Sequence, residues 1–356
     1  MRAMVLKEIC EVKVEGRTRQ REDLPIRAEP LELVDLPIPK PGLKEILIKV
    51  SACGVCRTEL DQIEGRISPP KLPVIPGHQP VGIVENLGAE VTKFEIGDRV
   101  GAAWIYASCG QCKFCQEGEE NLCEQFKGTG CHADGGYAEY MVISEDFAYK
   151  IPEKFTDLVK AAPLMCSGVI GYRSLRLTGM EDGKTLGLYG FGGAHHLVIQ
   201  MVNFKFPNSK KFVLSRNPVE RELAKNLGAD WVGEIEAKTP EKLDCAIDTT
   251  PAWKPTIRAL ENLERGGRLV INLIRKEEID KEFLLELDYP KHLWLEKEIK
   301  TVANVTRRDA EEFLALAAQM QIEPEIQAFK LEEANKALTE LKSGKIRGSK
   351  VLRMAV

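Results

Sequence analysis

The sequence predicts an α/β protein with two domains, one mostly β and one built on a doubly wound parallel sheet. The chain has 356 residues, which is enough for about two domains of roughly 150 residues each. Glycine, proline and short alternating runs characterise the first part of the chain, whereas apolar runs alternate with helical patterns from about Val169. With 44% hydrophobic residues, each domain can bury a core of its own.

The first predicted strands are short and are bounded by turns. Residues 45–50 alternate between apolar and polar side chains, and residues 80–85 form a second β-like run. Turn-forming residues precede the first run at Pro41-Gly42 and follow the second at Gly97-Asp98. This part of the chain is therefore expected to be mostly β.

Four short apolar runs in the second part are typical of strands that a parallel sheet buries on both faces. They are residues 185–189, 211–214, 243–248 and 268–273. A helix is predicted over 218–227, because Asn217 is a suitable cap, Pro218 suits the first helical position and Gly228 ends the pattern. This βαβ order indicates a doubly wound nucleotide-binding domain.

The C-terminal segment contains one more predicted helix and one more predicted strand. Residues 331–341 are amphipathic and are followed by Gly344, and Val351-Leu352 is a short apolar run. We expect this segment to fold back onto the first part of the chain.

The composition excludes several classes of protein. Fifty Lys and Arg against 54 Asp and Glu give a formal net charge of −4, so no basic stripe points to nucleic acid. The longest stretch without charged residues, 186–204, is interrupted by glycines and histidines and predicts a strand, a turn and a helix rather than a membrane span. No signal peptide is visible at the start, so we expect a cytoplasmic protein whose ten cysteines are reduced. Reduced cysteines in that number suggest a metal or redox role.

Four cysteines follow one another at close spacing. The pattern is C-x2-C-x2-C-x7-C, formed by Cys109, Cys112, Cys115 and Cys123. Four thiolates at this spacing can surround one zinc ion as a closed structural site. An iron–sulfur cluster and four inert thiols are the alternatives.

A second set of possible metal ligands is dispersed along the chain. It consists of Cys56, His78 and Cys166. Spacing alone leaves three interpretations open: a metal site, a redox pair of Cys53 with Cys56, or unrelated buried residues.

A glycine-rich loop follows the predicted strand 185–189. Gly190 allows a tight turn, and Gly192 and Gly193 let the backbone approach a pyrophosphate at a helix N-terminus. His195 stands where a third glycine would allow the helix and strand to approach more closely.

The next strand ends in Ser215-Arg216 rather than in an acidic residue. A hydroxyl with a guanidinium suits the 2′-phosphate of NADP(H) and offers no carboxylate to repel it. The alternative is a solvated surface arginine.

The order of these motifs over nearly the whole chain resembles that of the zinc-dependent medium-chain alcohol dehydrogenases. The resemblance implies a GroES-like catalytic domain over 1–167 and 302–356, with a structural-zinc lobe at about 105–125, and a Rossmann domain over 168–301. The matching motifs are Gly54-Val55-Cys56, Gly77-His78, Gly97-Asp98-Arg99-Val100, the four-cysteine lobe, Gly135-Gly136-Tyr137-Ala138-Glu139-Tyr140, Cys166, the glycine loop and Gly344-Lys345-Ile346-Arg347-Gly348.

The resemblance also implies roles for individual residues. Cys56, His78 and Cys166 match the ligands of the catalytic zinc, which makes two zinc ions per chain. Thr58 matches the hydroxyl that binds the substrate oxygen and begins the proton relay, and Glu59 matches the acid that orients the zinc-bound histidine.

Three further matches concern the cofactor and the substrate. Arg57 and Arg347 match residues that contact the cofactor pyrophosphate. Trp104 resembles a bulky pocket residue that favours small alcohols, although it could equally be a core tryptophan.

Three residues depart from the family pattern. Gln79 stands where the family usually has a glutamate, and Asp61 occupies the position often taken by a relay histidine. The proton can therefore leave through Asp61 itself or through water. His195 in place of the third loop glycine is shared by a subgroup of bacterial members.

These observations predict a zinc enzyme that interconverts small primary alcohols and aldehydes, with NADP(H) preferred and NAD(H) as the alternative. The other interpretations are a polyol or cinnamyl-type dehydrogenase, a non-catalytic dinucleotide-binding redox sensor and an iron–sulfur electron carrier. The resemblance also implies a homo-oligomer, a tetramer or a dimer, formed through the nucleotide domain.

Overall fold

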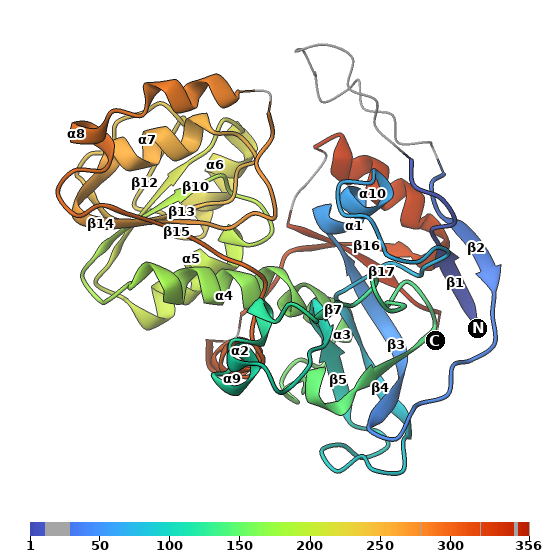
Figure 1. Cartoon of the computed structure of the whole chain (residues 1–356). Coiled ribbons are helices and arrows are strands. Elements are labelled where there is room, and N and C mark those ends of the chain that lie inside the picture. Colours follow the sequence, from blue (N-terminus) through green and yellow to red (C-terminus); the bar gives the residue numbers. More distant parts are fainter. Residues whose placement is uncertain (11–28, 279, 321, 345–347, 356) are drawn as a thin grey trace. The chain divides into compact units, whose positions relative to one another are not determined.

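The computed structural model describes the chain except residues 11–28, 279, 321, 345–347 and 356. It divides into two compact units (Figure 1). Unit 1 comprises residues 1–166, 304–318 and 323–356, and unit 2 comprises residues 167–303 and 319–322. No helix among the described residues is long and apolar enough to span a membrane.

Unit 1 is organised around a seven-stranded sheet, in which β3 is the longest strand. β3 pairs antiparallel with β4, β8 and β17, and β16 adds to β17 in parallel. The strands are β16 (Ile326–Lys330), β17 (Ser349–Arg353), β3 (Glu45–Val55), β4 (Pro80–Leu87), β5 (Arg99–Ala102), β9 (Ala148–Lys150) and β8 (Tyr140–Ser144). The runs predicted at 45–50, 80–85 and 351–352 are all strands, and each extends beyond the predicted run.

Short strands and helices complete unit 1. The additional strands are β1 (Arg2–Val5), β2 (Glu32–Asp35), β6 (Ile105–Ala107) and β7 (Lys127–Gly128). The helices are α1 (Arg57–Ile63), α2 (Lys113–Gln116), η2 (Glu120–Leu122), η3 (Glu145–Phe147), α3 (Leu158–Ala161), η4 (Ala162–Met165), η6 (Leu331–Glu333), α10 (Ala334–Lys342) and α9 (Arg307–Met320), whose last two residues belong to unit 2. The helix predicted over 331–341 is thus a short 3-10 turn followed by α10, and Gly344 follows it with a positive φ of 75°. The pairing of β17 with β3 confirms that the C-terminal segment returns to the first part of the chain.

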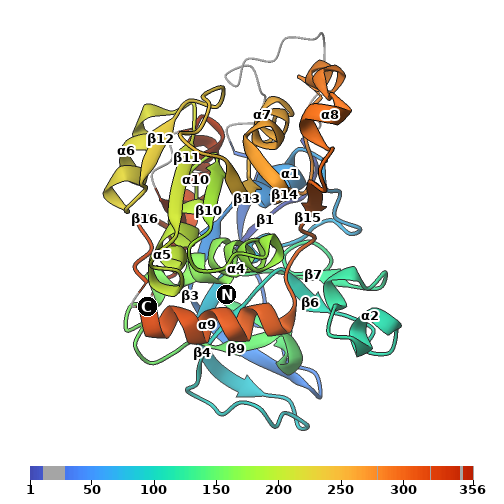
Figure 2. The same cartoon turned by 90° about the vertical axis from the view of Figure 1, so that its left-hand side faces the viewer.

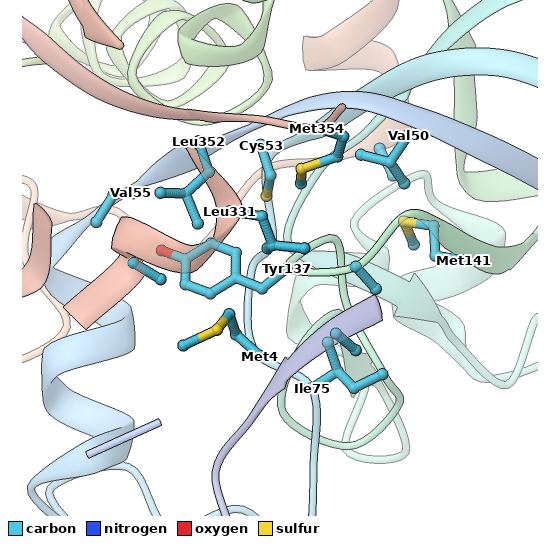
Figure 3. Packing of buried hydrophobic residues seen from close by; sticks show 14 of the residues in the cluster. Met4, Val50, Cys53, Val55, Ile75, Tyr137, Met141, Leu331, Leu352 and Met354 are labelled. Atoms are coloured by element: carbon cyan, nitrogen blue, oxygen red, sulfur yellow. The ribbon is translucent and has the colours of Figure 1, made fainter. Parts of the chain in front are cut away.

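The core of unit 1 surrounds the fully buried ring of Tyr137 (Figure 3). Side chains from β1, β3 and the C-terminal segment pack around it, among them Met4, Val55 and Leu352. The ring also fixes a turn, because a Cβ on Gly77 would lie 2.4 Å from Tyr137 Cδ1, and the φ of Gly77 is +100°. Only glycine fits this turn, which immediately precedes His78.

Unit 2 contains a six-stranded, fully parallel sheet with the order β12-β11-β10-β13-β14-β15 (Figure 2). Its strands are β10 (Thr185–Tyr189), β11 (Lys210–Leu214), β12 (Trp231–Gly233), β13 (Leu243–Asp248), β14 (Leu263–Ile271) and β15 (Glu298–Thr301). The order reverses at β10, which confirms the predicted doubly wound sheet. The run predicted at 268–273 is displaced, because β14 already begins at Leu263 and ends at Ile271.

Helices cover this sheet. They are α4 (Ser167–Thr178), α5 (His195–Lys205), α6 (Pro218–Asn226), α7 (Lys254–Asn262), η5 (Lys281–Glu286) and α8 (Tyr289–His292). α4 and α5 pack closely on one side of the sheet, where a Cβ on Gly171 would lie 2.9 Å from Val198 Cγ2, and α7 lies on the other side (Figure 1). α6 begins at Pro218 with Asn217 as its cap, as predicted, because the Asn217 side chain accepts a hydrogen bond from the N–H of Val219.

A buried ion pair fixes the loop that follows β13. Lys276 Nζ donates hydrogen bonds to Asp248 Oδ2 at 2.6 Å and to the carbonyl oxygens of Thr250 at 2.9 Å and Ala252 at 2.8 Å. Asp248 is fully buried, and its carboxylate is also bound by the hydroxyls of Thr250 and Thr256. Every polar atom of the pair therefore has a partner, which a buried ion pair requires.

Candidate active site and metal centres

The structure brings together the three dispersed candidate ligands Cys56, His78 and Cys166. Their donor atoms all lie within 4.8 Å of one another, and His78 Nε2 is 3.2 Å from Cys166 Sγ. Three donors of the Cys and His type, converging from distant parts of the sequence, form a set that zinc accepts with a fourth position left for another ligand. All three residues belong to unit 1.

Strand pairing explains this convergence. β3 leads into Cys56 and His78 precedes β4, and the two strands pair with Cys53 opposite Pro80. The end of one strand therefore lies beside the start of the other. Cys166 follows η4, a short 3-10 helix whose residues are all buried.

Glu59 connects two of the three candidate ligands. Its Oε1 lies 2.5 Å from His78 Nδ1, and its Oε2 accepts the backbone N–H of Cys56 at 2.8 Å. Glu59 is fully buried in the first turn of α1. A carboxylate on Nδ1 directs Nε2 of the ring towards the two cysteines, which is the arrangement found around metal-bound histidines.

The electrostatics of this cluster favour a thiolate. The hydrogen bond with Cys166 and the nearby His78 overcome the effect of burial and hold the pKa of Cys56 well below its usual range. The same hydrogen bond and burial raise the pKa of Cys166 well above it. Burial disfavours a charged His78, but Glu59 and Cys56 outweigh burial and raise the pKa of His78 to about 10. A cation at this position would therefore meet a negative sulfur ligand.

Thr58 and Trp104 both lie next to this cluster. Thr58 is buried, with its Oγ1 3.6 Å from Cys56 Sγ. The ring of Trp104 meets the ring of His78 edge to face, with 5.2 Å between the ring centres. Trp104 is only partly buried, so its ring borders the cluster and is not enclosed in the core.

Asp61 is engaged in an ion pair. Its Oδ1 accepts from Arg66 Nε at 2.5 Å. Arg66 also pairs with Glu64, which in turn pairs with Lys342 from α10. This network was not predictable from the sequence, because Lys342 is distant in the chain.

Two further predicted residues of unit 1 directly follow candidate metal ligands in the sequence. Arg57, half-buried, is the first residue of α1 and follows Cys56 directly. Gln79 follows His78 directly and is buried, and its side chain lies so close to Gly54 that a Cβ there would be 2.4 Å from Gln79 Oε1. Arg347 lies outside the described residues.

The four-cysteine lobe is a second compact set of sulfur donors. The Sγ atoms of Cys109, Cys112, Cys115 and Cys123 all lie within 4.8 Å of one another. Hydrogen bonds from the backbone N–H groups of Gln111 and Cys112 lower the pKa of Cys109 to about 6. A lowered pKa favours the thiolate that a metal ion requires.

The lobe is attached to the rest of unit 1 at both ends and through one buried carboxylate. β6 precedes it, β7 follows it, and the two strands pair. Glu120, buried within the lobe, accepts hydrogen bonds from the backbone N–H of Arg307 at 2.6 Å and from Arg307 Nε at 3.1 Å. The lobe is thus fixed to the start of α9.

The glycine loop of unit 2 connects β10 to α5. Gly190 has a φ of +79°, and a Cβ on Gly192 would meet no atom within 4 Å. Gly193 is partly exposed beside it. No side chain caps α5, so the N–H groups at its start suit a phosphate.

His195 fills the space between the glycine loop and the sheet. It is 1% exposed, and its Nδ1 lies 2.7 Å from the carbonyl oxygen of Gly190 and 3.5 Å from Thr249 Oγ1. The imidazole ring thus fits beside the turn, and a hydrogen bond to the carbonyl oxygen of Gly190 holds it there. Burial lowers the pKa of His195 to about 4, so the ring is neutral.

The Ser215-Arg216 pair has no carboxylate of its own, but Glu220 lies next to it at the end of β11. Ser215 Oγ donates a hydrogen bond to Glu220 Oε2 at 2.5 Å, and the backbone N–H of Phe191 in the glycine loop points to the same oxygen at 3.3 Å. Arg216 is exposed and makes no hydrogen bond or ion pair with any described residue. The strand end therefore presents a hydroxyl bound to an acid, next to a free guanidinium.

Sequence reasoning missed Glu220, although a signal was available. Asn217 and Pro218 fix the first residue of α6, which makes Glu220 the third helical residue. Side chains at that position reach back over the helix N-terminus.

Comparisons with known proteins show the family to which the chain belongs. A family model described as the alcohol dehydrogenase GroES-like domain matches residues 42–153 and confirms that domain. The chain is 41% identical over 333 residues to the probable alcohol dehydrogenase AdhA of Mycobacterium tuberculosis, covering 92% of this chain and 94% of that protein. It is 33% identical over 337 residues to an alcohol dehydrogenase of Geobacillus stearothermophilus, covering 92% and 97%. A cobalt- and zinc-bound thermostable alcohol dehydrogenase from Pyrobaculum aerophilum matches with a TM-score of 0.84 at 25% identity, over 99% of both chains.

Proposed function

Since this chain belongs to the medium-chain alcohol dehydrogenase family and is an alcohol oxidoreductase, we propose that it is a zinc enzyme that interconverts small primary alcohols and aldehydes with NAD(P). The observation that carries the proposal is the convergence of Cys56, His78 and Cys166, whose donor set is that of a catalytic zinc site. The relative from Pyrobaculum aerophilum holds cobalt and zinc. The four-cysteine lobe supplies a second, structural site, so that each chain holds two zinc ions.

The chemistry divides between the bound groups and the chain. A zinc ion at Cys56, His78 and Cys166 supplies a Lewis acid for an alcohol or carbonyl oxygen, and NAD(P) supplies the acceptor or donor of the hydride. Glu59 holds the His78 ring in the orientation for binding, through its contact with Nδ1.

Proton transfer is assigned to Thr58 Oγ1. The hydroxyl accepts a hydrogen bond from the substrate hydroxyl and passes its own proton on. Arg66 binds Asp61 Oδ1, so this oxygen is not free to receive the proton. The exit leads through water or through Asp61 itself.

The cofactor is assigned to unit 2. Gly190, Gly192, Gly193 and the uncapped start of α5 receive the pyrophosphate. The exposed guanidinium of Arg216 supports a preference for NADP(H), with NAD(H) as the alternative.

The substrate assignment rests on Trp104. Its ring borders His78, so it narrows the space in front of the metal ligands and favours a small primary alcohol. A polyol or a cinnamyl-type alcohol would need more room on this side.

A substrate panel with a metal analysis tests the proposal. We expect the purified enzyme to oxidise short primary alcohols and reduce their aldehydes, and to contain two zinc ions per chain. Cys56→Ser should abolish turnover and leave the circular dichroism spectrum unchanged. Full activity of this variant would refute the catalytic site, one zinc ion or none would refute the two-site assignment, and visible absorbance would indicate an iron–sulfur cluster.

We also propose that the chain forms a homo-oligomer through unit 2. β15 is the edge strand of the six-stranded sheet, and all four of its residues, Ile299 among them, are exposed. The apolar side chains of Trp294 and Leu285 in the preceding segment are exposed as well. A second copy could continue the sheet at this edge and cover these side chains. Light scattering should give the mass of a dimer or tetramer, and a monomeric mass would refute it.

The two cysteine-rich metal sites also require reduced thiols, which supports the cytoplasm as the compartment.

A further inference from the structure

Glu220 lies where the ends of two neighbouring strands meet. One of its donors, the Phe191 N–H, follows β10, and the other, the Ser215 hydroxyl, follows β11. β10 and β11 pair in parallel, so both donors are at the carboxyl edge of the sheet. A doubly wound sheet binds its dinucleotide at this edge, with the adenosine ribose beside the end of the second strand.

Among the described residues, hydrogen bonds reach only one oxygen of Glu220. Both hydrogen bonds end on Oε2, while Oε1 accepts none from any described residue. Glu220 is partly exposed, so Oε1 can reach a ligand. A carboxylate oxygen accepts hydrogen bonds from the hydroxyls of a ribose and repels a phosphate.

Ser215 is already satisfied by neighbouring protein groups. Its hydroxyl donates to Glu220 Oε2 and accepts the backbone N–H of Asn217 at 3.1 Å. The hydroxyl has a single proton, so it cannot donate to a 2′-phosphate while it is bound to Glu220. Of the two residues expected to bind that phosphate, only Arg216 is free to do so.

We propose that Glu220 is a specificity-determining residue that binds the 2′ and 3′ hydroxyls of the adenosine ribose and so keeps NAD(H) acceptable to an enzyme that Arg216 biases towards NADP(H). The proposal rests on the proposed use of NAD(P). Arg216 provides a favourable contact for the 2′-phosphate of NADP(H), and Glu220 provides one for the ribose hydroxyls of NAD(H). Because Glu220 also repels the phosphate, it reduces the preference for NADP(H).

The test is the affinity of the Glu220→Gln variant for the two reduced cofactors. The amide retains an acceptor for Ser215 and Phe191 but loses the negative charge. Titrations of the zinc-loaded protein, followed by nicotinamide fluorescence, give Kd for NADH and for NADPH. We expect the ratio of Kd for NADH to Kd for NADPH to rise about tenfold, since a hydrogen bond to a charged group is replaced by one to a neutral group and the repulsion of the phosphate is removed.

Glu222→Gln is the matched control. Glu222 is an exposed residue of the same helix that pairs with Lys225, so this variant changes the net charge equally without affecting the strand end. For this control variant, the ratio of Kd for NADH to Kd for NADPH should equal that of the wild type. A ratio for Glu220→Gln within twofold of the wild type, or an equal loss of both affinities, would overturn the proposal.

The binding assay separates this inference from the proposed reaction. An altered ratio supports the role of Glu220 even if no alcohol is oxidised. If the ratio of Kd values is unaltered and the enzyme oxidises alcohols, the role proposed for Glu220 is wrong, whereas the proposed function still stands.

Discussion

Replacing His195 by Asn should make the stability of unit 2 less sensitive to acid. Burial lowers the pKa of His195 from 6.5 to about 4 in the folded chain. Below pH 6.5 the unfolded chain takes up a proton at this residue, whereas the folded chain does so only near pH 4. The unfolded state thus binds more protons in this window, and the free energy of unfolding falls as the pH falls.

The magnitude follows from the width of the window. A depression of about 2.5 units, from 6.5 to about 4, corresponds to roughly 3 kcal/mol at about 1.4 kcal/mol per unit. His195 is almost completely buried, so solvent screening reduces this value little. Of the stability measured at neutral pH, this amount is lost by about pH 4.

Asn is the variant of choice because its amide can donate to the Gly190 carbonyl oxygen, as Nδ1 does, and does not titrate. Its smaller volume costs about 1–2 kcal/mol at neutral pH. That cost is independent of pH and does not affect the comparison.

Denaturant unfolding of both proteins at about pH 7 and about pH 4.5 measures the effect. We expect the wild type to lose about 2–3 kcal/mol more than His195→Asn between the two values. Protonation of the metal ligands also destabilises both proteins in acid, but equally, so it cancels in the difference. An equal loss in both proteins would refute the assignment of a neutral, buried His195.

Three further predictions follow from other contacts. Arg216→Ala should weaken the binding of NADPH about tenfold and that of NADH less than twofold, and equal effects in a fluorescence titration would contradict the role of this guanidinium. Cys115→Ser should remove one zinc ion per chain and lower the Tm of unit 1, and two zinc ions in a metal analysis of the variant would contradict a structural site in the lobe. Lys276→Met should leave the buried Asp248 without its cation and lower the free energy of unfolding by about 3 kcal/mol, and a loss below about 1 kcal/mol in a denaturant titration would show that the ion pair is not stabilising the loop.

Periodicity predicted the elements of unit 2 better than those of unit 1. Buried parallel strands are continuous apolar runs, so 185–189 and 243–248 match β10 and β13 over their whole lengths. β3 continues five residues beyond its predicted end, because Ser51-Ala52-Cys53-Gly54 lacks the alternation that marks a strand. Ala52, Cys53 and Gly54 are buried all the same, and the backbone of this segment pairs with β4 on one side and β17 on the other.

The residues of the candidate site also differ in how well the sequence alone predicts them. The four-cysteine lobe was predictable from spacing, because its ligands are local in the sequence. Cys56, His78 and Cys166 required the family resemblance, since only the pairing of β3 with β4 and the position of η4 bring them together. Glu220 and Lys342 act through contacts between elements, which single-sequence patterns do not contain.

The path of the chain through unit 1 has a consequence for folding during synthesis. Residues 167–303 of unit 2 are inserted between Cys166 and Asn304, and the strand β17, which lies between β16 and β3 in the seven-stranded sheet, is made after this insertion. All three ligands of the candidate catalytic site leave the ribosome before the insertion does, but the pairing of Lys350 with Val55, next to Cys56, must wait until the insertion has been made. Most of unit 2 is available to fold as one continuous segment, whereas unit 1 depends on contacts between distant residues, which form slowly. The nascent chain therefore exposes the free edge of β3 and a set of unprotected thiols until the segment that contains β17 has been made.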